Sequence, residues 1–111
     1  MSEYKTILLK ISGETFEGAN GAIDIDSVKA IAEQLNRVRK LGVRLGIVVG
    51  GGNFWRGRSA QGLERATADG IGMLATVMNA SALGSVMSDM GIPNKVVSAV
   101  PVEKVADRYY L

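Results

Sequence analysis

The stretch VRLGIVVGGGN, residues 43–53, decides the fold class of this chain. Its first seven residues are mostly apolar and β-branched, which is typical of a buried strand, and three glycines, Gly50 to Gly52, follow directly. Glycines let a ligand approach the main chain, so successive N–H groups can form a concave anion site. In open α/β sheets ligands bind at the carboxyl ends of strands. The pattern favours a phosphate-binding loop; the alternative is a tight strand-to-helix turn that needs one glycine.

Two common nucleotide-binding motifs are excluded at this loop. A Walker A loop would end in Gly-Lys-Ser/Thr, and that ending is missing. A dinucleotide fingerprint would accept Gly50 and Gly52, but its third glycine would fall on Trp55. The loop therefore indicates a phosphate without indicating which one.

The chain before this stretch completes a βαβ unit. Residues 4–11 are apolar and β-branched after a polar start, which predicts a strand whose centre is buried on both faces. From Asp26 the period changes to three or four, which predicts an amphipathic helix capped near Asp26 or Ser27 and stopped by Gly42. The apolar positions of this helix are Val28, Ile31, Ala32, Leu35, Val38 and Leu41. Such a unit joins parallel strands by a right-handed crossover. The intervening residues 14–25 are rich in Gly and Asn, which predicts a connecting loop or, as the alternative, a lid beside the site.

The chain after the glycines continues the alternation of helix and strand. Apolar and small residues recur at helical spacing from about Leu63, and Gly91 with Pro93 would end this second helix. Residues 95–100 predict a third strand, and residues 101–103 resemble a turn and the start of another helix. We expect one α/β domain over residues 1–111, a Rossmann-like three-layer sandwich with a mainly parallel sheet that is incomplete on its C-terminal side.

Composition excludes several chemistries. The 111 residues contain no cysteine and no histidine, so a disulfide framework, the usual zinc ligands and a Ser-His triad are all absent from the sequence. The net charge of +2 comes from basic residues scattered along the chain, which argues against a nucleic-acid partner. The first residues show no secretory signal, so we expect a cytoplasmic protein.

One long uncharged stretch, residues 70–88, needs a separate interpretation. It is long enough to cross a bilayer, but it contains Thr, Asn, Ser and Gly residues and lacks basic anchors and an aromatic belt. We expect no membrane span here. A helix that is buried on most sides, partly by another subunit, fits the many small residues better.

Charged residues near the strand ends are candidates for a site with the glycine loop. Lys10, followed by Ile11, Ser12 and Gly13, ends the first strand and would converge with the loop if the two strands are neighbours. Arg56 follows the loop, where its guanidinium could grip a phosphate through two bonds. Asp69 would be a helix cap, a carboxylate that accepts hydrogen bonds from ligand hydroxyls, or both. Taken singly, each of these side chains could instead be a solvated surface charge.

Three segments together resemble the bacterial uridylate kinases of the amino-acid-kinase superfamily: ILLKISGE at 7–14, VVGGGNFWRG at 48–57 and ADGIGMLATVMNA at 68–80. The resemblance covers nearly the whole chain, in order, and the third segment points to the uridylate branch. It implies transfer of the ATP γ-phosphoryl group to UMP, with Mg²⁺ that accompanies ATP and a homohexameric assembly. It also implies that the chain is the N-terminal, UMP-side part of a longer domain, inactive without a C-terminal ATP-binding half.

The resemblance also implies roles for particular residues. Lys10 and Arg56 would be catalytic, Gly51 and Asp69 would bind UMP, and the ATP-binding residues would be Lys10, Ile11, Ser12, Gly13, Gly52 and Arg56. Two rival interpretations remain open. One is a non-catalytic module for phosphate binding and oligomerisation, and the other is an amino-acid kinase with a carboxylate or carbamate acceptor.

Overall fold

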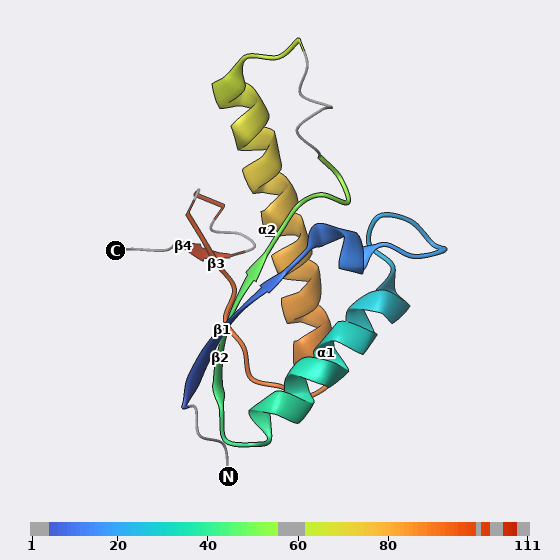
Figure 1. Ribbon diagram of the computed structural model, residues 1–111, viewed down its shortest axis with the longest axis vertical. Helices are drawn as coiled ribbons and strands as arrows, with labels where there is room; N and C mark the ends of the chain where they lie inside the picture. Colours follow the sequence, from blue (N-terminus) through green and yellow to red (C-terminus); the bar gives the residue numbers. More distant parts are fainter. Residues whose placement is uncertain (1–4, 56–61, 100, 103–105, 109–111) are drawn as a thin grey trace.

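A computed structural model describes residues 5–55, 62–99, 101–102 and 106–108 of the chain (Figure 1). It contains four strands, two long helices and one short 3₁₀ helix. In chain order these are β1 Thr6–Ile11, η1 Gly13–Phe16, α1 Ile25–Arg39, β2 Arg44–Val49, α2 Arg65–Asp89, β3 Val97–Ser98 and β4 Asp107–Arg108.

The central βαβ unit is present as predicted. Strands β1 and β2 pair in parallel, in a register that runs from Thr6 opposite Arg44 to Ile11 opposite Val49. Helix α1 connects them and lies alongside the pair (Figure 1). The fold is therefore α/β with a parallel sheet that is not closed, which confirms the expected class.

Both long helices pack against one face of this strand pair. The core contains the buried residues Phe16, Val28, Ile31, Ala32, Leu35, Leu83, Val86, Met87 and Ile92, with side chains from alternate strand positions packed against it. Leu9 and Ile47 belong to that inner face, whereas Leu8 is 73% exposed and Val48 is 51% exposed on the other. The prediction that the centre of β1 is buried on both faces is therefore wrong. Successive side chains of a strand point to opposite faces, and here the second face is left largely uncovered.

The ends of α1 differ by a few residues from the prediction. The N-cap is Asp24, whose side chain accepts a hydrogen bond from the backbone N–H of Asp26 at 2.9 Å, so neither Asp26 nor Ser27 caps the helix. The helix ends at Arg39, and Gly42 adopts the left-handed φ of +86° that a side chain would disfavour. Leu41 consequently lies beyond the apolar face of the helix and is 64% exposed.

The predicted loop at residues 14–25 is more ordered than its composition suggests. Helix η1 includes Phe16, which is fully buried and part of the core. After it, Gly18 and Gly21 bond to each other through both backbone groups at 3.1 Å and 3.1 Å, closing a short hairpin. The segment is therefore a folded connection, held at both ends by the core and by the Asp24 cap.

The third strand is shorter than predicted and pairs elsewhere. Of the described residues 95–99, only Val97–Ser98 forms a strand, and it pairs in parallel with β4, not with the β1–β2 sheet. The side-chain amide of Asn94 donates to the backbone oxygen of Gly84 at 3.1 Å, which ties this segment to the C-terminal end of α2. The predicted turn and helix start at 101–103 lie partly outside the described residues. The backbone N–H of Ala106 donates to the carbonyl of Val102 at 3.1 Å, and the chain enters β4 at Asp107.

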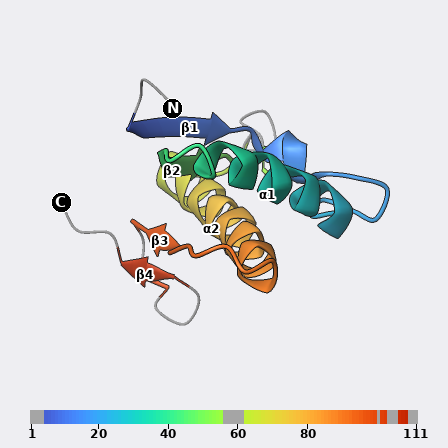
Figure 2. The same cartoon turned by 90° about the horizontal axis from the view of Figure 1, so that it is seen from below.

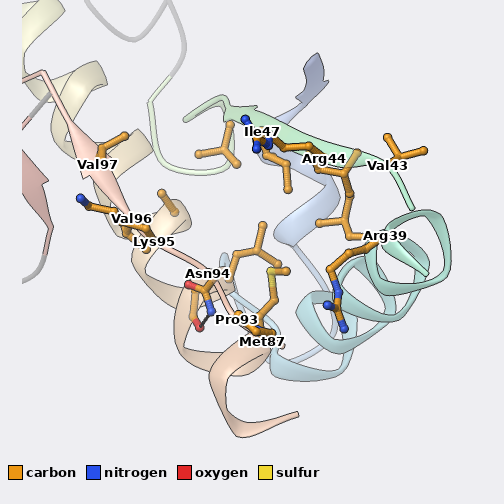
Figure 3. Close-up of a pocket in the computed structure, with 16 residues that line it drawn as sticks. Arg39, Val43, Arg44, Ile47, Met87, Pro93, Asn94, Lys95, Val96 and Val97 are labelled. Carbon is orange, nitrogen blue, oxygen red and sulfur yellow. Dashed lines mark hydrogen bonds between the residues drawn. The ribbon is translucent and has the colours of Figure 1, made fainter. Parts of the chain in front are cut away.

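A groove of about 340 Å³ separates β2 from the segment before β3 (Figure 3). Val43, Arg44 and Ile47 line it on the β2 side, and residues 94–97 line it on the other. No described strand pairs with β2 along this edge. The outer edge of β2 is therefore one of the two edges of this sheet that no described strand covers.

Helix α2 is the longest element and runs past both strands (Figures 1 and 2). It contains an 18-residue window with a mean hydropathy of 1.4 and is long and apolar enough, by length and composition alone, to cross a membrane. Its residues Ala75, Leu83 and Met87 are buried within the α/β fold, however, as in the core helix of a globular domain. Leu74 and Met78, on the opposite side, are 50% and 46% exposed, and Met73 is 43% exposed. This chain alone therefore buries only part of the helix, and the predicted burial by another subunit stays a prediction.

Candidate functional site

The carboxyl ends of β1 and β2 meet at one edge. The backbone N–H of Gly50 donates to the carbonyl of Ile11 at 2.8 Å, which extends the ladder one step past the last strand pair. Lys10 lies opposite Val48 in the register, and its side chain is exposed on the uncovered face. The condition for Lys10 to converge with the glycine loop, that β1 and β2 are neighbours in the sheet, is therefore met. The shared role of the two in a site stays a prediction.

The two loops after these strands approach so closely that only glycine fits at Gly13. A Cβ built there would lie 2.5 Å from the backbone nitrogen of Gly52, 2.8 Å from Asn53 Oδ1 and 3.0 Å from the carbonyl carbon of Gly51. Real Cβ atoms do not approach backbone atoms this closely, so any side chain would force the loops apart. The glycine at position 13 thus keeps the ends of both strands in contact.

Helix α2 closes the loop from the other side. A Cβ on Gly51 would lie 2.8 Å from the Cβ of Ala75 and 3.2 Å from the carbonyl oxygen of Gly72. The chain then turns, with the N–H groups of Phe54 and Trp55 both donating to the oxygen of Gly51 at 3.0 Å and 2.9 Å. The three glycines therefore serve contacts on both sides of the loop, which a single turn would not require.

Two asparagines fasten the glycine loop to α2. Asn79 is fully buried, and its Nδ2 donates to the oxygen of Gly50 at 2.8 Å and to Asn53 Oδ1 at 2.7 Å. Asn53 Nδ2 donates in return to Asn79 Oδ1 at 2.8 Å and also to the oxygen of Ala22 at 2.9 Å. The loop is thus held at its first and last residues by side-chain amides.

Glu14 introduces a negative charge that the sequence analysis did not anticipate. Its carboxylate accepts a hydrogen bond from the Ser12 hydroxyl, and it lies against Gly52, where it would meet any side chain built at that position. The carboxylate is exposed. A negative charge in this position would repel an anion that approached the loop.

The remaining predicted site residues are distributed as follows. Ile11, Ser12, Gly13, Gly51 and Gly52 lie together at the carboxyl edge. Arg56 lies outside the described residues. Asp69 is exposed and belongs to the second turn of α2, since the helix begins at Arg65 after an N-cap at Glu64 that makes no side-chain bond. Its predicted role as a cap is therefore wrong, but three residues separate it from Gly72, whose carbonyl oxygen lies next to Gly51, so Asp69 lies on the side of α2 nearest the loop.

The sequence pattern did not predict a role for Asn79, which is part of a helical motif. A weak signal is present: Ala75, Asn79 and Leu83 are spaced four residues apart, so one amide side chain lies on an otherwise apolar face of the helix. A buried amide needs partners, and the nearby loop supplies them.

The fold and the site define an α/β protein whose glycine-rich loop lies at the carboxyl edge of two parallel strands, where such sheets bind ligands. The chain belongs to the amino acid kinase family, whose model matches residues 5–110. It is similar in structure to the UMP kinase from Ureaplasma parvum, with a TM-score of 0.90 and 31% sequence identity over 98% of this chain. The UMP kinase from Bacillus anthracis gives a TM-score of 0.88 and 32% identity over 96% of the chain. The chain spans about half of these proteins, 47% and 46% of their lengths.

Replacing Glu14 by glutamine should strengthen phosphate binding at the loop several-fold. Removing the carboxylate charge removes a like-charge competitor for the ligand, while the amide keeps the size of the side chain. Titration with UMP, followed by calorimetry, measures the change. Glu17→Gln is the matched control, because it makes the same change of net charge in the same connection. Equal effects of the two substitutions would contradict a local role for Glu14.

Proposed function

We propose that this chain is the N-terminal, UMP-side part of a kinase domain that transfers the γ-phosphoryl group of ATP to UMP and produces UDP. The observation that supports this most directly is the loop Gly50–Asn53, clasped between Gly13 and α2 beside Lys10, within a chain that superposes on two UMP kinases over almost its full length. The family also includes kinases with other acceptors, so the identity of the acceptor is part of the proposal.

The proposed mechanism relies on positioning and charge. Backbone N–H groups of the glycine loop and of residues Ser12 and Gly13 would hold phosphate oxygens, and the Lys10 ammonium would offset the charge that develops on the transferred group. Gly51 and Asp69 would contact UMP, Ile11 and Gly52 would contact ATP, and Arg56 would reach the phosphates of both. Phosphoryl transfer needs little covalent chemistry from the protein, so a chain without histidine is suited to it.

The proposed metal is Mg²⁺ carried by the ATP phosphates. The described residues contain no group of three or more carboxylates that could hold a metal ion. None of the roles given above to Lys10 or the backbone amides depends on a metal ion held by the protein.

Activity of the proposed kind requires more than these 111 residues. The solved relatives are about twice as long as this chain, so we expect much of the ATP site to be formed by residues beyond these 111. ATP held only by its phosphates would be poorly positioned, and misplacement by about 1 Å costs on the order of a hundredfold in rate. We propose that the chain alone binds UMP weakly and does not form UDP.

A thermal-shift screen tests the acceptor. A ligand that binds only the folded state raises the melting temperature, so UMP should raise it and acidic amino acids should not. A shift with glutamate or aspartate but not with UMP would favour an amino-acid kinase. A shift with UMP, without UDP formation after extension to the length of the relatives, would favour a non-catalytic binding module.

We also propose that α2 mediates assembly into a homo-oligomer, in a cytoplasmic protein. Its exposed residues Leu74 and Met78 are four residues apart and share one face, on a helix that has no charged residue between Asp69 and Asp89. Contiguous exposed apolar surface of this kind marks interfaces. The proposed final assembly is a hexamer, with this contact between pairs.

Met78→Glu should therefore weaken self-association by at least tenfold, since a charge would be buried in an apolar contact. Sedimentation velocity over a range of concentrations measures the effect. Ala30→Glu, at an exposed position of α1, is the control and should leave association unchanged. A well-behaved monomer of the unsubstituted chain at high concentration would exclude this interface.

A further inference from the structure

We propose that Asn79 and Asn53 are positioning residues that orient the glycine loop for its ligand and couple that loop to the hairpin at residues 18–22. The part of this inference that concerns ligand binding rests on the proposed function. The part that concerns coupling between the two loops does not.

The Asn79 side chain uses its whole amide in this contact. Both hydrogens of Nδ2 are donated, to the oxygens of Gly50 and Asn53, and Oδ1 accepts from Asn53, at distances between 2.7 Å and 2.8 Å. The residue is fully buried, so water cannot replace these partners. Leaving any of the buried groups unpaired costs more than the hydrogen bond itself contributes, which makes the arrangement highly specific for asparagine.

The bond to Gly50 fixes the direction of the next amide. A peptide unit is planar and trans, so its C=O and N–H point in opposite directions. Because the Gly50 carbonyl points at Asn79, the N–H of Gly51 in the same peptide unit points away from Asn79. Asn79 therefore sets the orientation of an N–H group that the proposed site uses, without touching the ligand.

Asn53 carries the coupling to the other loop. Its Nδ2 donates to Ala22 as well as to Asn79, so one side chain joins the glycine loop, α2 and the hairpin. The hairpin itself is weakly held, by the Gly18–Gly21 pair and by a 3.3 Å bond from the N–H of Asn20 to Asp24. Ordering of the glycine loop by a ligand should then order residues 18–22, and the coupling should be reciprocal.

Hydrogen exchange of the backbone amides tests the coupling without any ligand. In Asn53→Ala and in Asn79→Ala, exchange at Gly18, Asn20 and Gly21 should become about tenfold faster relative to Val28 in the core. Normalising to Val28, whose N–H donates to the oxygen of Asp24 at 3.0 Å, removes the effect of global destabilisation. Asn53→Ala changes a partly exposed loop residue and keeps the test valid if Asn79→Ala does not fold.

Asn94→Ala is the matched control. Asn94 also holds α2 through side-chain amide bonds, to Gly84 and Ser88, but at the end of the helix away from the glycine loop. It should leave the normalised exchange of residues 18–21 unchanged. If the normalised exchange rates of residues 18–21 in the Asn53 and Asn79 variants equal those in Asn94→Ala, the proposed coupling is refuted.

Titration with inorganic pyrophosphate and with UMP, followed by the amide signals of Gly51 and Gly52, tests the positioning role. Asn79→Ala should weaken binding about tenfold, and bound ligand should slow exchange at residues 18–21 in the unsubstituted chain but not in Asn53→Ala. Unchanged affinity in Asn79→Ala would overturn the positioning role. Absence of binding to the unsubstituted chain would refute the proposed function, while the ligand-free exchange would still decide the coupling.

Discussion

Replacing Lys10 by alanine should lower kcat for UMP phosphorylation by about 10²- to 10³-fold, the usual effect of removing one charge-stabilising group, and should change KM for UMP much less. Lys10 lies one residue from the carboxyl end of β1, opposite Val48 and beside the glycine loop. Its charge would act mainly while the phosphoryl group is transferred. Removing it should therefore destabilise the transition state more than the bound substrate. Steady-state kinetics on the kinase extended to the length of its relatives measure both constants.

Lys5→Ala is the matched control for Lys10. Lys5 is also an exposed lysine, and its carbonyl accepts from the N–H of Arg44 at 2.9 Å at the opposite end of the same strand pair. At about 3.3 Å per residue it lies roughly 17 Å from Lys10. Its loss should leave kcat nearly unchanged. Near-normal turnover in Lys10→Ala, or an equal loss in both variants, would remove Lys10 from the catalytic assignment.

Gly13→Ala should destabilise the fold by roughly 1–3 kcal/mol, the usual cost of an added methyl group in a tightly packed site, and should abolish measurable UMP binding. The new Cβ would lie 2.5 Å from the Gly52 nitrogen and 3.0 Å from the Gly51 carbonyl carbon, and these backbone atoms can move only if the loop moves. The displacement falls on the peptide units proposed to hold the ligand. Urea denaturation and calorimetric titration with UMP measure the two effects.

Gly70→Ala provides the control for stability. A Cβ there would meet no atom within 4 Å, and the residue lies inside α2. Alanine favours a helix over glycine by up to about 1 kcal/mol, so this variant should be at least as stable as the unsubstituted chain. If Gly13→Ala is also as stable as the unsubstituted chain, the two loops can move apart at little cost in free energy, and the prediction for Gly13 is refuted.

Local patterns predicted the elements that build the edge of the site. The apolar run before Gly50 and the three- and four-residue spacing from Val28 to Leu35 report which backbone geometry buries those side chains, and that information is contained in neighbouring residues. The parallel pairing of the first two strands followed from chain topology. The sequence alone therefore predicts that the carboxyl ends of β1 and β2, with Lys10 and the glycine loop, lie at one edge of the sheet.

The sequence predictions were wrong where the burial or pairing of a segment depends on which distant part of the chain packs against it. The apolar side chain of Leu8 was predicted to be buried, but burial requires a second layer, and the face that carries it is largely uncovered. The strand predicted at 95–100 requires a backbone partner in the sheet, and Asn94 instead ties the segment to α2. Phe16 looked like part of a polar loop, although it fills the core between the helices.

The sequence by itself determined the βαβ unit, the glycine loop and the resemblance that led to the family, because period, glycine spacing and motif order are properties of short stretches of chain. Only the tertiary structure decided how the loop is held. Asn53 and Asn79 are 26 residues apart, and Asn53 and Ala22 are 31 apart, so their contacts exist only because α2 passes behind the ends of both strands. A buried amide is specified by the partners that surround it, and those partners are assembled by packing.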